Sequence, residues 1–210
     1  MTDLTPYLPG IFAAYSILLV GAASPGPAVA MLLGISTTQG RGPSLIASLG
    51  IACGSMTINI LTLMGVGLLL SEAAWAMTGL RILGAAYLVW LAWGAFAKAI
   101  NPPAVSPEQT VPKPAHLLFW QGYALQVTNP KAIAFWLAIA TVGAVIGAGL
   151  TITLIFVFGA FLISFAAHGA WSLMLSTTPV RKAYARARRW IEAALGAFFV
   201  FAAFKIATER

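Results

Sequence analysis

Charged residues and cysteines are scarce in this chain of 210 residues. Only 8% of the residues are charged, and Cys53 is the one cysteine. Soluble domains carry about 25% charged residues, so the polar side chains here are too few to cover the surface of a water-soluble protein. A single cysteine also excludes an intrachain disulfide. The composition therefore excludes an ordinary soluble domain and indicates a protein in contact with lipid.

Acidic residues are the scarcest charged type, and they avoid the apolar stretches of the sequence. There are five: Asp3, Glu72, Glu108, Glu192 and Glu209. Each falls in a tail, in a loop or at the end of an apolar segment. Glu192 is expected at the start of the last segment, within reach of water. A strongly cationic cargo normally requires a carboxylate inside the membrane, and the sequence predicts none there.

Apolar residues make up 60% of the chain and gather in long segments. A transmembrane helix needs about 20 predominantly apolar residues. Six such segments are predicted near residues 9–34, 44–70, 82–97, 117–142, 145–172 and 190–207. The predicted fold is an all-α integral membrane protein of about six transmembrane helices, in a single transmembrane domain covering 1–210.

A proline-rich stretch divides the chain at its midpoint. It predicts a linker over about 101–116, between a first half of about 1–100 and a second half of about 117–210. Pro25 and Pro130 are 105 positions apart, half of the 210-residue length. Since three spans per half is an odd number, two related halves must be inverted across the membrane. The sequence therefore predicts two inverted three-helix repeats, an architecture found in many secondary transporters.

Basic residues concentrate in alternate loops. The first, third and fifth loops contain most of them: Arg41, Lys98, Lys113, Arg181, Lys182, Arg186, Arg188 and Arg189. Short cytoplasmic loops are rich in lysine and arginine, so these three loops are predicted on the cytoplasmic side and both termini outside. Between apolar segments such a cluster indicates a membrane surface, and no nucleic-acid partner is expected.

Two proline-containing sites interrupt otherwise good spans. The first is Ser24, Pro25, Gly26 and Pro27, and the second is Asn129, Pro130 and Lys131. A proline inside a helix removes a hydrogen bond and clashes with the preceding turn. In lipid the freed carbonyls need partners, so irregular backbone persists only where protein or a water-filled cavity surrounds it. The two breaks, at matching places in the halves, are predicted to form a substrate site. A purely structural kink is the alternative for each.

The second break has the chemistry of a carboxylate-binding site. Asn129 is a favourable N-cap and Pro130 suits the first position of a helix. A helix beginning there would place its positive end beside Lys131, where it would attract an anion. The alternative is that Lys131 lies at the membrane boundary and only extends its charge toward water.

Three further polar residues lie within the apolar segments. His168 is a candidate for proton coupling because histidine titrates near neutral pH, although a lone histidine on an apolar helix is more often a hydrogen-bonded core residue. Ser55 and Asn59 are candidates for proton coupling or for supporting the substrate site. The alternative is close helix packing, because they follow the Gly50–Gly54 pair and small and polar residues favour such contacts. No metal ligand set, catalytic motif or cofactor site is predicted.

These features together resemble the lysine exporter (LysE/RhtB) family of amino-acid efflux proteins. The resemblance covers most of the chain and rests on Ser24-Pro25-Gly26-Pro27, Gly40, Gly42, Gly50, Gly54, Gly84 to Leu91, Gln121-Gly122 and Asn129-Pro130-Lys131. It implies a multi-pass protein of the bacterial inner membrane that exports amino acids or close derivatives, driven by the proton-motive force. It implies no enzymatic chemistry and no cofactor.

The chain departs from the family pattern at two positions. Exporters of basic amino acids in this family often have an acid where this chain has Ser55, and one near the position of His168. Their loss favours neutral cargo of the threonine, homoserine or branched-chain type. Two other classes stay open, an accessory membrane subunit without transport activity and, less favoured, an intramembrane enzyme. Expected partners are an amino acid and the lipid bilayer, and the sequence leaves a homo-oligomer open.

Overall fold

The computed structural model describes residues 3–72, 74–102, 111–142 and 144–208, and within these ranges all regular secondary structure is helical. A short 3-10 helix, η1, covers Thr5–Tyr7. The α-helices are α1 (Leu8–Ala23), α2 (Pro27–Thr38), α3 (Arg41–Glu72), α4 (Ala74–Ile100), α5 (Ala115–Thr128), α6 (Pro130–Thr141), α7 (Leu150–Leu175) and α8 (Thr178–Thr208). Residues 103–110 of the predicted linker lie outside the described ranges.

Two of the predicted spans are broken where the prolines predict it. Between α1 and α2, the chain is extended at Ser24 and Gly26, and Pro27 begins the new helix. Between α5 and α6 the break is the single extended residue Asn129, and Pro130 begins α6. Proline suits the first turn of a helix because its missing N–H would have no partner there. Both predicted breaks are confirmed.

Within the described ranges, five stretches of helix are long and apolar enough to cross a membrane, and α2 and α6 are shorter apolar helices. The five are Thr5–Ala23, Arg41–Gly65, Ile82–Ile100, Leu150–Leu175 and Thr178–Thr208. The half-helices α5 and α6 have 14 and 12 residues, fewer than the ~20 that a bilayer requires. Neither α5 nor α6 is long enough to cross the bilayer alone, so the two half-helices together form one crossing. The prediction of an all-α membrane protein is confirmed.

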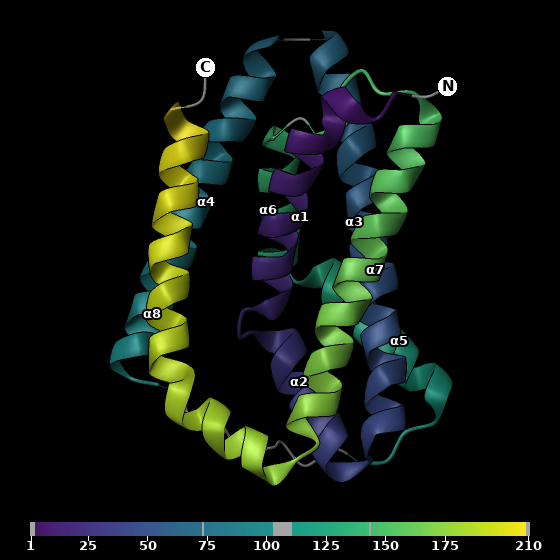
Figure 1. Cartoon of the computed structure of the whole chain (residues 1–210), viewed down its shortest axis with the longest axis vertical. Coiled ribbons are helices and arrows are strands. Elements are labelled where there is room, and N and C mark those ends of the chain that lie inside the picture. The colour runs from purple at the N-terminus through teal and green to yellow at the C-terminus, as the bar shows by residue number, and fades with distance from the viewer. Residues whose placement is uncertain (1–2, 73, 103–110, 143, 209–210) are drawn as a thin grey trace.

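The helices form two groups with α1, α2 and α6 between them (Figure 1). Helices α4 and α8 pack along each other on one side, and α3 packs against α5 and α7 on the other. At the α3–α5 contact, a Cβ on Gly122 would collide with the Ala47 carbonyl, and one on Gly50 with the Phe119 carbonyl. Glycine at both positions lets the two backbones touch, as small residues do between membrane helices.

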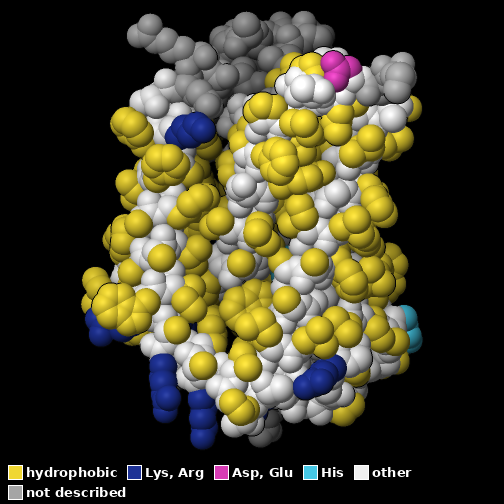
Figure 2. Space-filling view, viewed as in Figure 1, with side chains coloured by type: hydrophobic (Ala, Val, Ile, Leu, Met, Phe, Trp, Pro, Cys, Tyr) yellow, Lys and Arg dark blue, Asp and Glu magenta, His cyan; other side chains and the backbone are white. Residues whose placement is uncertain are grey.

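Large apolar side chains cover the outer surface in Figure 2. Those more than half exposed include Phe12, Leu61, Ile82, Leu83, Trp93, Leu154, Phe158, Phe201 and Phe204. Water would make such a surface unfavourable at about 25 cal/mol per Å² of apolar area, whereas lipid tails impose no such cost.

The two ends of the molecule differ in charge. Figure 1 places both termini at one end, and the α2–α3 and α7–α8 connections at the opposite end, together with the end of α4 and the start of α5. Lysine and arginine side chains gather at the latter end in Figure 2. The three basic loops therefore lie together, while their position on the cytoplasmic side stays a prediction.

Three expectations from the sequence are wrong in detail. Helix α8 begins at Thr178 rather than near 190, so the basic cluster lies on its first turns; arginine, lysine and alanine there are good helix formers. Helix α7 begins at Leu150 rather than 145, after Gly147 with φ of +75°. Glu192, expected near water, is only 2% exposed, because α8 packs along α4 and the side chain lines a cavity between α4, α8 and the two breaks.

Candidate functional site

Lys131 joins the two breaks. It lies in the first turn of α6, and its ammonium donates hydrogen bonds to the carbonyls of Ser24 (3.1 Å) and Pro25 (3.3 Å) and to the Ser24 hydroxyl. These carbonyls follow the C-terminus of α1, whose partial negative charge favours a cation. A Cβ on Gly26 would lie 3.2 Å from the Lys131 Nζ, so the glycine leaves room for the ammonium. Lys131 supplies the partners that the irregular backbone of the first break needs.

Asn129 caps α6, as predicted. Its Oδ1 accepts a hydrogen bond from the backbone N–H of Lys131 at 3.1 Å. An N-cap of this kind is worth about 1 kcal/mol of stability. It also fixes the point at which α6 begins, and therefore the position of the lysine stem.

The N-terminus of α2 has no side-chain cap. The backbone N–H groups of Ala28 and Val29 have no acceptor among the described residues, and both residues line the same cavity as Lys131. Free N–H groups at a helix N-terminus bind anions, aided by the helix dipole. The positive ends of α2 and α6 therefore meet at one cavity.

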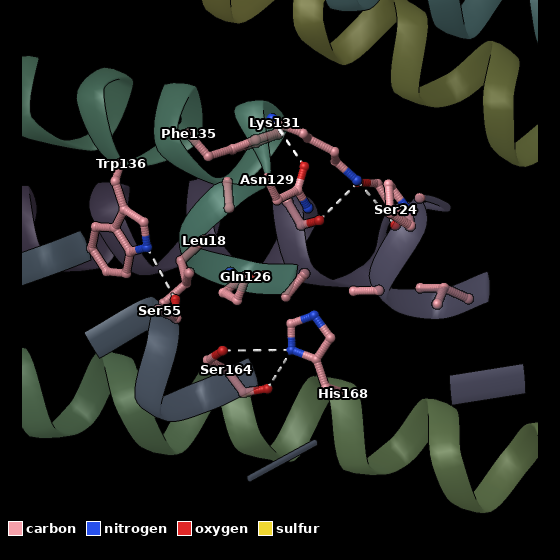
Figure 3. A pocket seen from close by; sticks show the side chains of 17 residues that line it. Leu18, Ser24, Ser55, Gln126, Asn129, Lys131, Phe135, Trp136, Ser164 and His168 are labelled. Carbon is pink, nitrogen blue, oxygen red and sulfur yellow. Dashed lines mark hydrogen bonds between the residues drawn. The ribbon is translucent and has the colours of Figure 1, made fainter. Parts of the chain in front are cut away.

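That cavity lies between the two breaks and helices α3, α5 and α7 and is partly open to solvent (Figure 3). It brings together seven of the predicted residues: Ser24, Gly26, Pro27, Ser55, Asn129, Lys131 and His168. Three predicted residues do not line it. Pro25 lines a neighbouring cavity and Pro130 is exposed. Asn59 is buried elsewhere, and its Nδ2 donates no hydrogen bond to any described residue.

His168 presents one ring nitrogen to the cavity. Its Nδ1 lies 2.8 Å from the Ser164 carbonyl oxygen. A carbonyl can only accept, so Nδ1 carries a proton and donates. In the neutral imidazole Nε2 then has a free lone pair, and Figure 3 shows this nitrogen directed away from Ser164 toward the interior of the cavity. His168 is thus both a hydrogen-bonded core residue, the alternative weighed from the sequence, and a cavity-lining acceptor.

Three of the cavity residues that the sequence analysis did not single out are Gln126, Trp136 and Phe135. Gln126 is buried, lines the cavity and makes no side-chain hydrogen bond within the described ranges. Trp136 donates from Nε1 to the Ser55 hydroxyl at 3.0 Å, and the Phe135 ring lies 5.9 Å from the Lys131 ammonium. A glutamine inside an apolar segment, three residues before the helix break, was a usable signal; the two aromatic positions carried none.

The cavity combines complementary sites for a small zwitterion. Lys131 and the N-terminus of α2 provide positive charge and N–H donors for a carboxylate, while His168 Nε2 and the Gln126 amide oxygen can accept from an ammonium. None of the described residues that line it is acidic. Nor do the described residues contain a group of three or more histidine, cysteine, aspartate or glutamate side chains placed to hold a metal ion.

Two broken helices around a buried polar cavity, in an otherwise lipid-facing bundle, define a multi-pass membrane transporter. The family model of the LysE type translocators matches residues 19–210. The chain therefore belongs to the LysE type translocator family, whose members are transporters and not enzymes. The resemblance seen in the sequence is confirmed, as is the prediction of a multi-pass inner-membrane protein without enzymatic activity.

Individual relatives are similar over most of their length. An uncharacterized membrane protein, YahN, of Escherichia coli K12 is 26% identical over 93% of this chain and 88% of the relative. The threonine efflux protein of the same strain is 26% identical over 86% and 89%. The cysteine/O-acetylserine efflux protein of Salmonella paratyphi A is 30% identical over 79% and 85%. No solved structure matches the chain.

Proposed function

We propose that this protein exports neutral amino acids from the cytoplasm and binds them at the cavity between the two helix breaks. The observation that carries the proposal is the Lys131 ammonium, hydrogen-bonded to the first break beside the uncapped N-terminus of α2. An amino acid's carboxylate would replace the Ser24 and Pro25 carbonyls as partner of this ammonium. Its ammonium group would face His168 and Gln126.

Neutral cargo follows from the charges that line the cavity. Lys131 is its only charged residue among those described, and a cationic side chain would find no carboxylate there. A hydroxyl or another small polar group could bond to Ser55 or Gln126. The names of the threonine and the cysteine/O-acetylserine efflux proteins describe cargo of this size and charge.

Alternating access would use the two helix groups. The proposed repeats are α1–α4 and α5–α8, each beginning with a broken span, with opposite orientations in the membrane. The α4–α8 pair would rock against α3, α5 and α7, with the breaks at the interface. We propose that the end carrying the basic connections is cytoplasmic and that the proton-motive force drives export.

Transport by purified protein in liposomes tests the proposal. A panel of labelled threonine, homoserine, leucine, cysteine, O-acetylserine and lysine would be offered with and without a pH gradient. We expect flux of neutral amino acids that the gradient increases, and little flux of lysine. Absence of flux for the whole panel, from folded and inserted protein, would contradict the proposal and favour an accessory subunit.

A further inference from the structure

A second cavity lies on the opposite side of the Lys131–Ser24 contact. It is partly open to solvent and is lined by residues of α4, α8 and the two breaks, among them Lys98, Glu192, Pro25 and Trp90. Ser24 and Lys131 line this cavity as well as the first. The hydrogen bonds between these two residues therefore form part of the wall that separates the cavities.

Glu192 is the unusual group in this second cavity. The residue is 2% exposed, and its Oε1 has no hydrogen-bond partner among the residues that the structure describes. Its ion pair within the described ranges is with Arg188, one helical turn earlier, at 3.8 Å from Nε. Removing a carboxylate from water costs several kcal/mol unless donors replace the water. One oxygen of the Glu192 carboxylate is therefore buried without a hydrogen-bond donor among the described residues.

Lys98 provides the opposite charge in the same cavity. It lies in the last turn of α4 and is exposed to solvent, yet its side chain lines the cavity that contains Glu192. The cavity thus has a buried acceptor and a more accessible cation. An amino acid carries both complementary groups, an ammonium with three N–H donors and a carboxylate.

We propose that this second cavity is a separate subsite for the transported amino acid, which binds its ammonium at Glu192 and its carboxylate at Lys98. The subsite lies toward the end of the molecule that carries the basic connections, since Lys98 and Arg188 both belong to that end. It receives the amino acid before the first cavity does. The Lys131–Ser24 contact closes the passage between the two, and the arriving carboxylate opens it by binding Lys131. This inference rests on the proposed export function.

Three variants test the subsite: Glu192→Gln, which removes the charge with little change of shape, Lys98→Gln, and Asp3→Asn as a control that removes an exposed acid at the other end. The measurement is counterflow of labelled L-threonine into liposomes that contain unlabelled L-threonine, over a range of concentrations. Counterflow needs no pH gradient, so it reports binding and passage alone. Size-exclusion profiles and melting temperatures establish that each variant is folded.

We expect Glu192→Gln and Lys98→Gln each to raise the half-saturating threonine concentration at least about tenfold, while the maximal rate changes little, because binding and not passage is weakened. Glu192→Asp should recover part of the loss, and Asp3→Asn should equal the wild type. If Glu192→Gln is unstable, the half-saturating concentration of Lys98→Gln alone tests the subsite. The Lys98 side chain is exposed, so its substitution should not affect folding.

Two results would overturn the subsite. Unchanged half-saturation in both variants would show that the cavity does not bind the amino acid and that Glu192 only compensates the charge of Arg188. The second result combines two assays of Glu192→Gln: normal counterflow, and a liposome flux that a pH gradient no longer increases. It would make Glu192 a proton-titrating group instead. Failure of the proposed function is distinguishable from both, because the wild-type protein would then show no counterflow.

Discussion

Lys131 and Ser24 are separated by 107 positions in the sequence, yet the lysine ammonium lies 3.1 Å from the serine carbonyl oxygen. The contact connects the start of α6 to the end of α1, the two places where a span is interrupted. It satisfies carbonyls that the first break leaves without helical partners, and it holds a positive charge at the wall of the cavity. One side chain thus serves both the stability of the fold and the proposed binding of a carboxylate.

Asn129 has two effects that substitution can separate. Asn129→Ala should lower the stability of the protein by about 1 kcal/mol, because α6 loses its N-cap. Asn129→Asp should keep the cap and the stability but reduce threonine flux, because a new negative charge beside Lys131 competes with the substrate carboxylate. Thermal unfolding and liposome flux measure the two effects. Asn101→Asp, in an exposed position after α4, is the control and should leave both unchanged.

His168 should contribute to affinity through its free nitrogen. His168→Ala removes an acceptor for the substrate ammonium, and a hydrogen bond to a charged group is worth about 1.5–3 kcal/mol. The half-saturating concentration in counterflow should rise roughly tenfold or more. His116→Ala, an exposed histidine at the start of α5, should not change it. An unaltered half-saturation in His168→Ala would restrict this residue to a packing role.

The α3–α5 contact should tolerate no side chain at Gly122. A Cβ there would meet the Ala47 carbonyl and lie 3.2 Å from the Ile51 nitrogen. Gly122→Ala should therefore force the helices apart and cost about 1–3 kcal/mol, seen as a lower melting temperature in detergent. Gly84→Ala is the matched control, since a Cβ on Gly84 meets nothing within 4 Å. It should be neutral or stabilising by up to about 1 kcal/mol. Equal melting temperatures for the two variants would contradict the packing seen in the structure.

The orientation in the membrane can be measured with cysteine labelling. In a Cys53→Ser background, Thr5→Cys marks the end with the termini and Thr178→Cys the end with the basic connections. An impermeant maleimide added to intact spheroplasts should label only Thr5→Cys, and permeabilised membranes should label both. The reverse pattern would place the basic connections outside and would overturn the direction of transport that we propose.

Local chemistry made much of this fold predictable from the sequence. Proline cannot continue a helix, so both breaks were foreseen, and Asn129 before Pro130 indicated the N-cap that the structure has. The length of the apolar segments alone predicted that the chain is an integral membrane protein. These features depend on a residue and its immediate neighbours, and the sequence contains that information directly.

Other features depend on tertiary packing and could not be predicted. Glu192 lies near the start of an apolar segment, and nothing in its neighbourhood shows that α4 and the breaks cover it. Asn59 follows Ser55 by one helical turn on the same face of α3, yet only Ser55 lines the cavity, and the position of the cavity along α3 has no local sequence signal. The division into two cavities also requires contacts between distant segments, and these have no local sequence signal.

The most direct test of the account is threonine counterflow in liposomes with Lys131→Met, which keeps much of the side-chain volume beside Phe135 but removes the charge. Lys113→Met is the control, since Lys113 is an exposed lysine that bonds only to Gln121 and Gln39 within the described ranges. We predict that Lys131→Met remains folded and loses counterflow at least about tenfold, while Lys113→Met transports like the wild type. Normal counterflow by folded Lys131→Met would show that the lysine only stabilises the break and would contradict a carboxylate site there.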